Sequence, residues 1–283
     1  MNLLESIYLR TQYGSALFAG FGAAFLIFLW AVSARSDRAR RLGLWVMGLS
    51  SAGLVGAFAV RWILTGRPWY LPPVMNQFEA VFASAMLAGL LGMGLEIAWK
   101  KNFFAIAGSL YATAALLATL IFAGKMGLAI TAEHGILDHP IMAAHVVVII
   151  IGHTLAGMTF FISLAYLGVC VGNAHRPPGQ TEIIIDRCNL VVAQLACWMI
   201  FLGVFLGAVW ADRAWGRWWG WDAKETWALI TAIIYLAIPH VRRNLLPRRQ
   251  GLATAVLCML GCLAMLFNWI VVNYFLTGLH SYA

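Results

Sequence analysis

Residues 141–171 form one uninterrupted apolar run, IMAAHVVVIIIGHTLAGMTFFISLAYLGVCV, whose only ionisable side chains other than Tyr and Cys are histidines. A membrane-spanning helix needs about 20 consecutive apolar residues, so this run is long enough to cross a bilayer and to tilt or project from it. The whole chain is 62% hydrophobic and only 11% charged, whereas soluble domains carry about 25% charged residues. This composition predicts an integral membrane protein.

Other apolar runs of spanning length occur on both sides of residues 141–171. Together they predict an all-α, polytopic integral membrane protein with about eight transmembrane helices, folded as a single membrane domain over residues 1–283. The first run has no convincing small-residue cleavage site, so no cleavable signal peptide is expected. The predicted spans are approximately 13–34, 42–64, 78–98, 103–123, 141–171, 189–210, 223–240 and 252–276.

The basic residues indicate the orientation of these spans. Most of the 19 lysines and arginines lie in short loops that follow the first, third, fifth and seventh spans. The positive-inside rule places those loops in the cytoplasm. Both termini and the loops 65–77 and 124–140 are then predicted on the outer, periplasmic or lumenal, side. The net charge of +8 reflects this distribution, and no nucleic-acid partner is expected.

A tryptophan-rich segment, WADRAWGRWWGWDAKETW at 210–227, lies on the predicted outer side between the sixth and seventh spans. Indole rings are amphipathic and favour the membrane–water interface. Gly216 and Gly220 permit a close approach to the backbone, and Arg213 and Arg217 offer cations for an anionic ligand group. The segment therefore predicts an aromatic platform for a large planar ligand at the membrane surface.

Three of the seven histidines have informative positions. His145 lies at the outward end of the fifth span and His280 just beyond the eighth, so both are predicted at the face of the tryptophan-rich segment. A six-coordinate haem takes one such imidazole on each side of its plane. His240 ends the seventh span toward the cytoplasm. Each of these histidines, taken alone, is also compatible with an interfacial or capping role.

The other polar residues fit simpler interpretations. His153, inside the fifth span, is predicted to hydrogen-bond a neighbouring helix, with a role as a third ligand left open. The remaining histidines are interpreted as solvated: His134, His139 and His175. Interhelical hydrogen bonding is predicted for Gln194, Asn268 and Asn273, and a solvated outer rim is one interpretation of Glu79, Asp222, Lys224 and Glu225. The five cysteines form no CxxC motif, so no zinc site or redox motif is indicated.

The tryptophan-rich segment, extended to residues 207–229, closely resembles the WWD domain of cytochrome c assembly proteins. Its continuation WDAKETWAL, residues 221–229, is similar to the CcsA (ResC) branch of System II, as is GLHSY at residues 278–282. Residues 76–79, Asn-Gln-Phe-Glu, resemble that family's Asn-Leu-Tyr-Glu segment with two changes. The resemblance covers most of the chain.

This resemblance implies a component of a cytochrome c haem lyase (synthase). It implies that His145 and His280 ligate an external haem, and that His240 ligates a transmembrane haem whose other ligand comes from a CcsB (ResB) partner. The implied haem-facing residues are Trp215, Trp218, Trp219, Trp221 and Asp222, and no acid–base catalytic residue is assigned.

The implied cargo is haem b, held without a covalent bond because the chain lacks the CxxCH motif. An apocytochrome c would supply that motif, kept reduced by a thiol reductant pathway. The implied location is the bacterial cytoplasmic membrane, or the thylakoid membrane of a plastid. Two alternatives remain open: a haem b electron-transfer subunit, which would pair histidines inside neighbouring helices, and a transporter of another planar solute, which would show broken helices and internal repeats.

Overall fold

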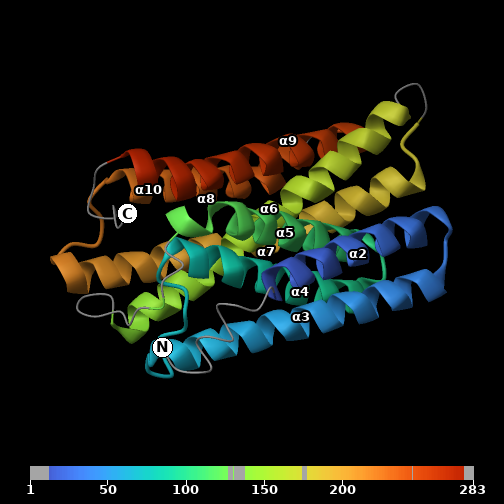
Figure 1. Cartoon of the computed structure of the whole chain (residues 1–283). Coiled ribbons are helices and arrows are strands. Elements are labelled where there is room, and N and C mark those ends of the chain that lie inside the picture. The colour runs from blue at the N-terminus through green and yellow to red at the C-terminus, as the bar shows by residue number, and fades with distance from the viewer. Residues whose placement is uncertain (1–12, 127–129, 131–137, 174–176, 244, 277–283) are drawn as a thin grey trace. The chain divides into compact units, whose positions relative to one another are not determined.

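The computed structural model describes residues 13–126, 130, 138–173, 177–243 and 245–276. Within these ranges every regular element is a helix, which confirms the all-α prediction (Figure 1). The long helices are α2 (Tyr13–Ser33), α3 (Asp37–Thr65), α4 (Gln77–Trp99), α5 (Phe103–Phe122), α6 (Pro140–Gly172), α7 (Gln180–Trp215), α8 (Ala223–Arg242) and α9 (Pro247–Leu266). A 3-10 turn, η1 (Ala123–Lys125), follows α5, and a π-helical turn, η3 (Phe267–Val271), and α10 (Val272–Phe275) follow α9.

Seven of the described helical stretches are long and apolar enough to span a membrane, so the polytopic prediction is confirmed. They are α2 to α7 and the continuous stretch Pro247–Phe275. The predicted seventh span also forms a helix, α8, over the expected residues. It falls outside this set because Lys224 and Glu225 in its first turn and Pro239-His240 near its end lower its hydropathy. The side on which each terminus lies stays a prediction.

The chain divides into two compact units, residues 1–150 and 151–283, with the division inside α6. In the first unit α4 packs against α3 and α5, and α2 packs against α3 and α5. Small residues bring α4 and α5 close together: a Cβ added at Gly92 would lie 2.9 Å from the Gly108 Cα. Small residues at such contacts are typical of membrane helices, whose backbones approach closely. The single domain over 1–283 stays a prediction.

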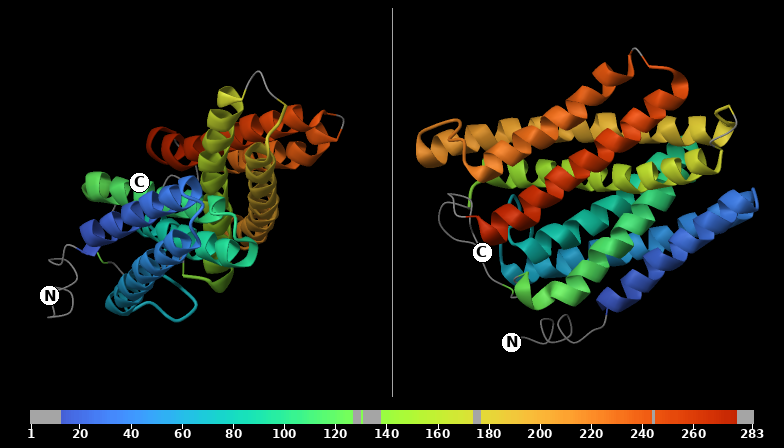
Figure 2. Two further views of the ribbon diagram at one scale, coloured as in Figure 1. Left: turned by 90° about the vertical axis from the view of Figure 1, so that its right-hand side faces the viewer. Right: turned by 90° about the horizontal axis from the view of Figure 1, so that it is seen from above.

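In the second unit α7, α8 and α9 pack against one another (Figure 2), and η3 contacts α8 and α9.

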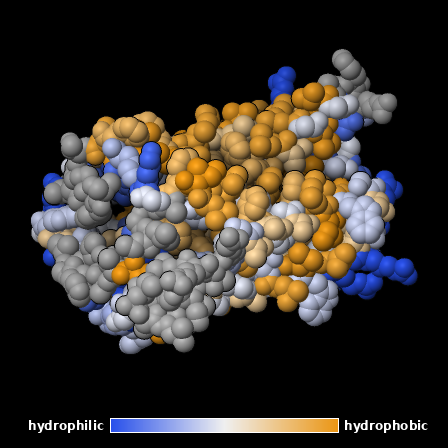
Figure 3. Space-filling model, viewed as in Figure 1, coloured by the Kyte–Doolittle hydropathy of each residue, from blue (hydrophilic) through white to orange (hydrophobic). Residues whose placement is uncertain are grey.

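On the face seen in Figure 3, apolar side chains cover the middle stretches of the helices and hydrophilic ones lie near the helix ends. Large apolar residues such as Trp45, Leu49 and Trp198 are mostly exposed. In a soluble protein such side chains would be buried, so this surface is suited to lipid.

Candidate functional site

The tryptophan-rich segment is a short connection between two well-terminated helices. Helix α7 ends at Trp215, and Gly216 follows in the left-handed conformation with φ +70°. Its N–H donates to the Asp212 carbonyl at 2.9 Å. A residue with a side chain is strained in that conformation, which explains why a glycine occupies position 216. Helix α8 begins at Ala223, so residues 216–222 form the non-helical connection.

A capping box fixes the other end of this connection. The Asp222 carboxylate accepts a hydrogen bond from the Glu225 N–H at 2.8 Å. The Glu225 carboxylate in turn accepts from the N–H groups of Asp222, at 3.3 Å, and Gly220, at 2.7 Å. These bonds satisfy donors that the first turn of a helix leaves without partners. Asp222 and Glu225 therefore shape the loop.

The loop presents two of its indole rings to the surroundings. Trp218 and Trp221 are 52% and 70% exposed, and Trp221 has a left-handed backbone with φ +58°. Trp219 meets Trp221 edge-on, with ring centroids 5.9 Å apart, while Trp215 packs edge-on against the buried Trp210. The rings thus divide into an inner pair that anchors the loop and an outer group available to a ligand.

Two exposed arginines accompany these rings, Arg213 on the last turn of α7 and Arg217 in the loop. The Arg217 guanidinium lies directly over Gly220, where any Cβ would collide with it. Gly220 therefore makes room for an arginine of the loop itself. An exposed guanidinium beside exposed indoles suits a ligand that is both aromatic and anionic.

The first turn of α8 is tied to the π-helical turn η3 and to α10. The Lys224 ammonium donates to the Asn273 side-chain oxygen at 2.6 Å, and the Asn268 amide donates to the Lys224 carbonyl at 3.2 Å. Trp227 packs on Phe267 with ring centroids 4.1 Å apart. Interhelical hydrogen bonding is thus confirmed for Asn268 and Asn273. Gln194, in contrast, lies exposed on α7.

The described histidines on or beside α6 have different surroundings. His145 is half-buried on the second turn of α6. His139 is not merely solvated: its Nδ1 accepts a hydrogen bond from the Ile141 N–H at 3.1 Å, which caps the start of α6. His153 is buried and its ring lies 5.5 Å from that of Trp269.

His240 is exposed near the end of α8. Its Nδ1 lies 2.8 Å from the Leu236 carbonyl oxygen. Because a carbonyl only accepts, Nδ1 is the donor in this contact, and Nε2 is the ring nitrogen left for a metal. A hydrogen bond of this kind orients metal-binding imidazoles and fixes their tautomer. His240 therefore offers Nε2 as the atom that could coordinate iron. His134, His175 and His280 lie outside the described residues, so the pairing of His145 with His280 stays a prediction.

Glu79 is completely buried, so the interpretation of this residue as part of a solvated rim is wrong. Its carboxylate accepts from Arg61 Nε at 3.0 Å, Arg67 Nη1 at 2.8 Å and the Met75 N–H at 3.0 Å. The Asn76 side chain caps the same helix by accepting from the Glu79 N–H. A buried carboxylate needs such partners. Arg61, inside an otherwise apolar run, was the sequence signal for this ion-pair cluster.

The two predicted outward loops of the first unit also touch each other. The Tyr70 hydroxyl donates to the Asp138 carboxylate at 3.0 Å. That hydrogen bond raises the pKa of Tyr70, with smaller contributions from burial and from the negative charge of Asp138.

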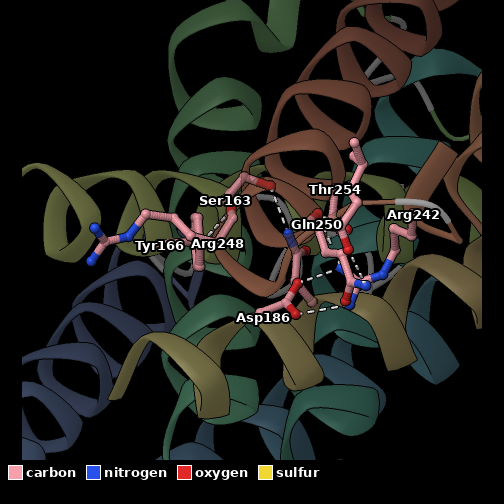
Figure 4. A network of polar contacts seen from close by, with 9 residues as sticks. Ser163, Tyr166, Asp186, Arg242, Arg248, Gln250 and Thr254 are labelled. Atoms are coloured by element: carbon pink, nitrogen blue, oxygen red, sulfur yellow. Dashed lines mark hydrogen bonds and ion pairs between the residues drawn. The ribbon is translucent and has the colours of Figure 1, made fainter. Parts of the chain in front are cut away.

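A second polar cluster lies in the second unit near the end of α8 that bears His240 (Figure 4). Arg242 donates to both carboxylate oxygens of Asp186, at 2.6 and 2.8 Å, and also to Thr254 Oγ1 and the Gln250 carbonyl. Nearby, Arg248 donates to Glu182 at 3.1 Å. By charge alone these arginines indicated only the orientation of the spans, whereas in the structure both join the start of α7 to neighbouring helices.

The known proteins that this chain resembles include cytochrome c assembly and biogenesis proteins. Residues 74–280 match the model of a family described as cytochrome c assembly protein. NrfI of Wolinella succinogenes is 33% identical over 144 residues, which is 50% of this chain and 16% of NrfI. The cytochrome c biogenesis protein CcsA of Chlamydomonas reinhardtii is 29% identical over 243 residues, 84% of this chain and 67% of that protein.

The protein of the same name from Prochlorococcus marinus is 45% identical over 84 residues, 30% of this chain and 26% of that protein. The chain therefore spans less than two thirds of the length of two of these three relatives, NrfI and the Prochlorococcus protein.

Proposed function

Since the chain belongs to the cytochrome c assembly protein family and so has a role in cytochrome c biogenesis, we propose that it carries haem to its outer face and presents it there for attachment to an apocytochrome c. Haem b is the cargo and substrate in this proposal. The chain acts as the haem-handling component of a cytochrome c haem lyase in the bacterial cytoplasmic membrane or the thylakoid membrane.

The observation that carries the proposal is the construction of the tryptophan-rich loop. Its exposed rings, Trp218 and Trp221, lie in a connection held by the capping box, and Arg213 and Arg217 are exposed beside them. Haem is a flat aromatic ring with two carboxylates, so indole faces and guanidinium groups match its two kinds of surface. In this proposal His145 and His280 supply the axial ligands.

His240 supports a second, inner haem site. Its exposed imidazole has Nε2 available as a ligand because Nδ1 donates to Leu236. The residues around it on α8 are exposed and apolar, with Ile233 52% and Leu236 44% exposed. An exposed ligand on an apolar helix face suits a haem shared with another membrane subunit. We infer a CcsB (ResB)-type partner that provides the second axial histidine.

The attachment itself needs placement more than acid–base help. Each cysteine thiol of the apocytochrome CxxCH motif adds across one haem vinyl group: the sulfur bonds one vinyl carbon and the proton ends on the other. No oxidant is consumed. The thiols react as thiolates, so a thiol reductant pathway must keep them reduced. This chain contributes by fixing the ring so that the vinyl edge meets the thiols, and Asp222 and Glu225 contribute by shaping the loop.

The test is the haem content and cytochrome c yield of single variants. His145→Gly, His240→Gly and His280→Gly are expected to lower both, and added imidazole is expected to restore them by replacing the lost ligand. His153→Gly is the matched control, because this histidine is buried against Trp269 and is proposed not to bind iron. Wild-type haem content and maturation in all three variants would show that the ligand set is wrong. Quinol oxidation by the purified chain would instead favour an electron-transfer subunit.

A further inference from the structure

Helix α8 has one exposed face that ends in a histidine and an arginine. Ile233, Leu236, His240 and Arg243 follow one another at three- or four-residue spacing and are all exposed. Residues so spaced lie on one side of a helix. The helical path continues through Arg243, whose φ of −53° and ψ of −33° are helical and whose N–H approaches the His240 carbonyl at 3.4 Å. Arg243 therefore lies one turn beyond His240 on the same side.

Arg243 differs from the other arginines near this end of α8. Arg242 is engaged with Asp186, Thr254 and Gln250, and Arg248 is engaged with Glu182 (Figure 4). Arg243 is exposed and forms no ion pair among the residues that the structure describes. The bonds of Arg242 hold its guanidinium toward α7 and α9, whereas Arg243, three residues after His240, lies on the helix face of His240.

A negative group beside His240 would need such a cation. The carboxyl-terminal end of a helix carries a partial negative charge that repels anions. A carboxylate at an apolar helix face is also costly unless a positive group accompanies it. Arg243 is about 4.5 Å farther along the helix axis than His240, an offset that its long side chain can span to meet a carboxylate at the edge of a porphyrin bound to His240.

We propose that Arg243 binds a propionate carboxylate of the haem that His240 ligates, and so sets the orientation of the haem in the inner site. The propionate edge then points toward the end of α8, and the vinyl edge points toward the middle of the helix. This inference rests on the proposed function, in which His240 is an iron ligand. It adds a specificity-determining residue that recognises the carboxylate of the cargo.

The test compares haem with haem dimethyl ester, in which both propionates are neutral. The purified chain carries His145→Gly and His280→Gly throughout, so that the outer site lacks both of its proposed ligands, and no imidazole is added, because imidazole would restore that site. Binding is followed by the absorption of the ligated haem. Arg243→Gln is expected to weaken haem binding about tenfold, as for the loss of one charge-assisted hydrogen bond. The same variant is expected to bind the dimethyl ester as the parent does.

The matched control is Arg249→Gln, which removes another exposed arginine at the start of α9 and is expected to leave both affinities unchanged. Equal weakening by Arg249→Gln would overturn the inference, because surface charge in general would then explain the effect. Equal weakening of haem and of its ester by Arg243→Gln would overturn it as well. If His240→Gly binds haem like the parent, the inner ligand of the proposed function is wrong. If His240→Gly weakens haem binding and Arg243→Gln does not, the inference about Arg243 is wrong and the proposed ligand His240 still stands.

A lipid phosphate has the same charge chemistry as a propionate, so the titrations are run in two kinds of nanodisc. One contains phosphatidylcholine alone and the other contains added phosphatidylglycerol. A defect of Arg243→Gln that is present in both supports binding of the haem carboxylate. A defect that appears only with phosphatidylglycerol would overturn the inference and show that Arg243 binds a lipid headgroup.

Discussion

Arg242 holds Asp186 by two parallel hydrogen bonds, with nitrogen–oxygen distances of 2.6 and 2.8 Å. This bidentate pair joins the end of α8 to the start of α7, two residues beyond His240. Arg–carboxylate pairs of this geometry are the strong and orientationally specific ones. The pair therefore fixes the position of the helix end that carries the proposed inner haem ligand.

Breaking this pair is expected to affect both stability and the inner haem. Asp186→Asn leaves a largely buried guanidinium without its counter-charge and should lower the free energy of unfolding by about 2–3 kcal/mol. This is less than for a fully buried pair, because the two side chains keep 12% and 14% of their exposure. Thermal unfolding in detergent measures the loss, and the absorption of His240-dependent haem should fall with it.

The pair of Arg248 and Glu182 provides the control for this prediction. It lies in the same polar cluster and also involves the start of α7. It joins α7 to α9, however, and does not hold the end of α8. Glu182→Gln is therefore expected to destabilise the protein without changing the spectrum of inner haem in the molecules that remain folded. The same spectral change in Glu182→Gln and Asp186→Asn would contradict a specific role for Arg242.

The buried carboxylate of Glu79 predicts a second large effect. Glu79→Gln leaves the guanidinium groups of Arg61 and Arg67 together in the interior, and such a change is expected to cost about 3–5 kcal/mol. The control is Asp37→Asn, because Asp37 is 87% exposed in its contact with Arg40 and exposed pairs contribute about 0–1 kcal/mol. Unfolding temperatures and protease cleavage within residues 66–76 measure the difference. Equal stability of the two variants would contradict the buried cluster.

Asn268 predicts a link between the π-helical turn and the start of α8. Asn268→Leu removes the hydrogen bond to the Lys224 carbonyl and should lower the free energy of unfolding by about 1 kcal/mol. It should also reduce haem in the proposed outer site, because η3 leads into the segment that contains His280. Gln194→Leu removes an exposed amide on α7 and is expected to change neither quantity. Unchanged haem content in Asn268→Leu would show that η3 does not position that segment.

The helices were predictable because each apolar run is long and its boundaries are marked by polar residues. Polar extensions of the helices were not: α7 begins at Gln180, whereas its apolar run predicted a start near residue 189. The additional turns carry Glu182 and Asp186, which are held by arginines from α8 and α9. Hydropathy gives no weight to a polar turn that is stabilised by partners distant in the sequence.

In the candidate site, too, features formed by contiguous residues were predictable and contacts between distant residues were not. The tryptophan-rich loop and its charged flanks were predictable because they are contiguous in the sequence. The burial of Glu79 depends on Arg61 and Arg67, which reach it from a different helix and loop. The π-helical turn at Phe267–Val271 lies within a continuous apolar run, so no change in composition indicated its position in the sequence.

Trp221 predicts a separation of stability from function. Its left-handed backbone, with φ +58°, costs a residue with a side chain about 1–2 kcal/mol, whereas asparagine tolerates this conformation. The ring is 70% exposed and its described ring contact is with Trp219, so Trp221→Asn loses little packing. The unfolding temperature should stay the same or rise, while haem attachment should fall because the proposed platform loses one ring.

Trp218→Asn is the matched variant, since Trp218 is also exposed but has no left-handed backbone. It should lower haem attachment to a similar extent without any gain in stability. Unfolding temperature and cytochrome c yield are measured for both variants. If Trp221→Asn matures cytochrome c as well as the parent, the exposed ring is not part of the haem site. If it destabilises the fold, the native contacts of the Trp221 ring outweigh the backbone cost, and the predicted separation of stability from function is wrong.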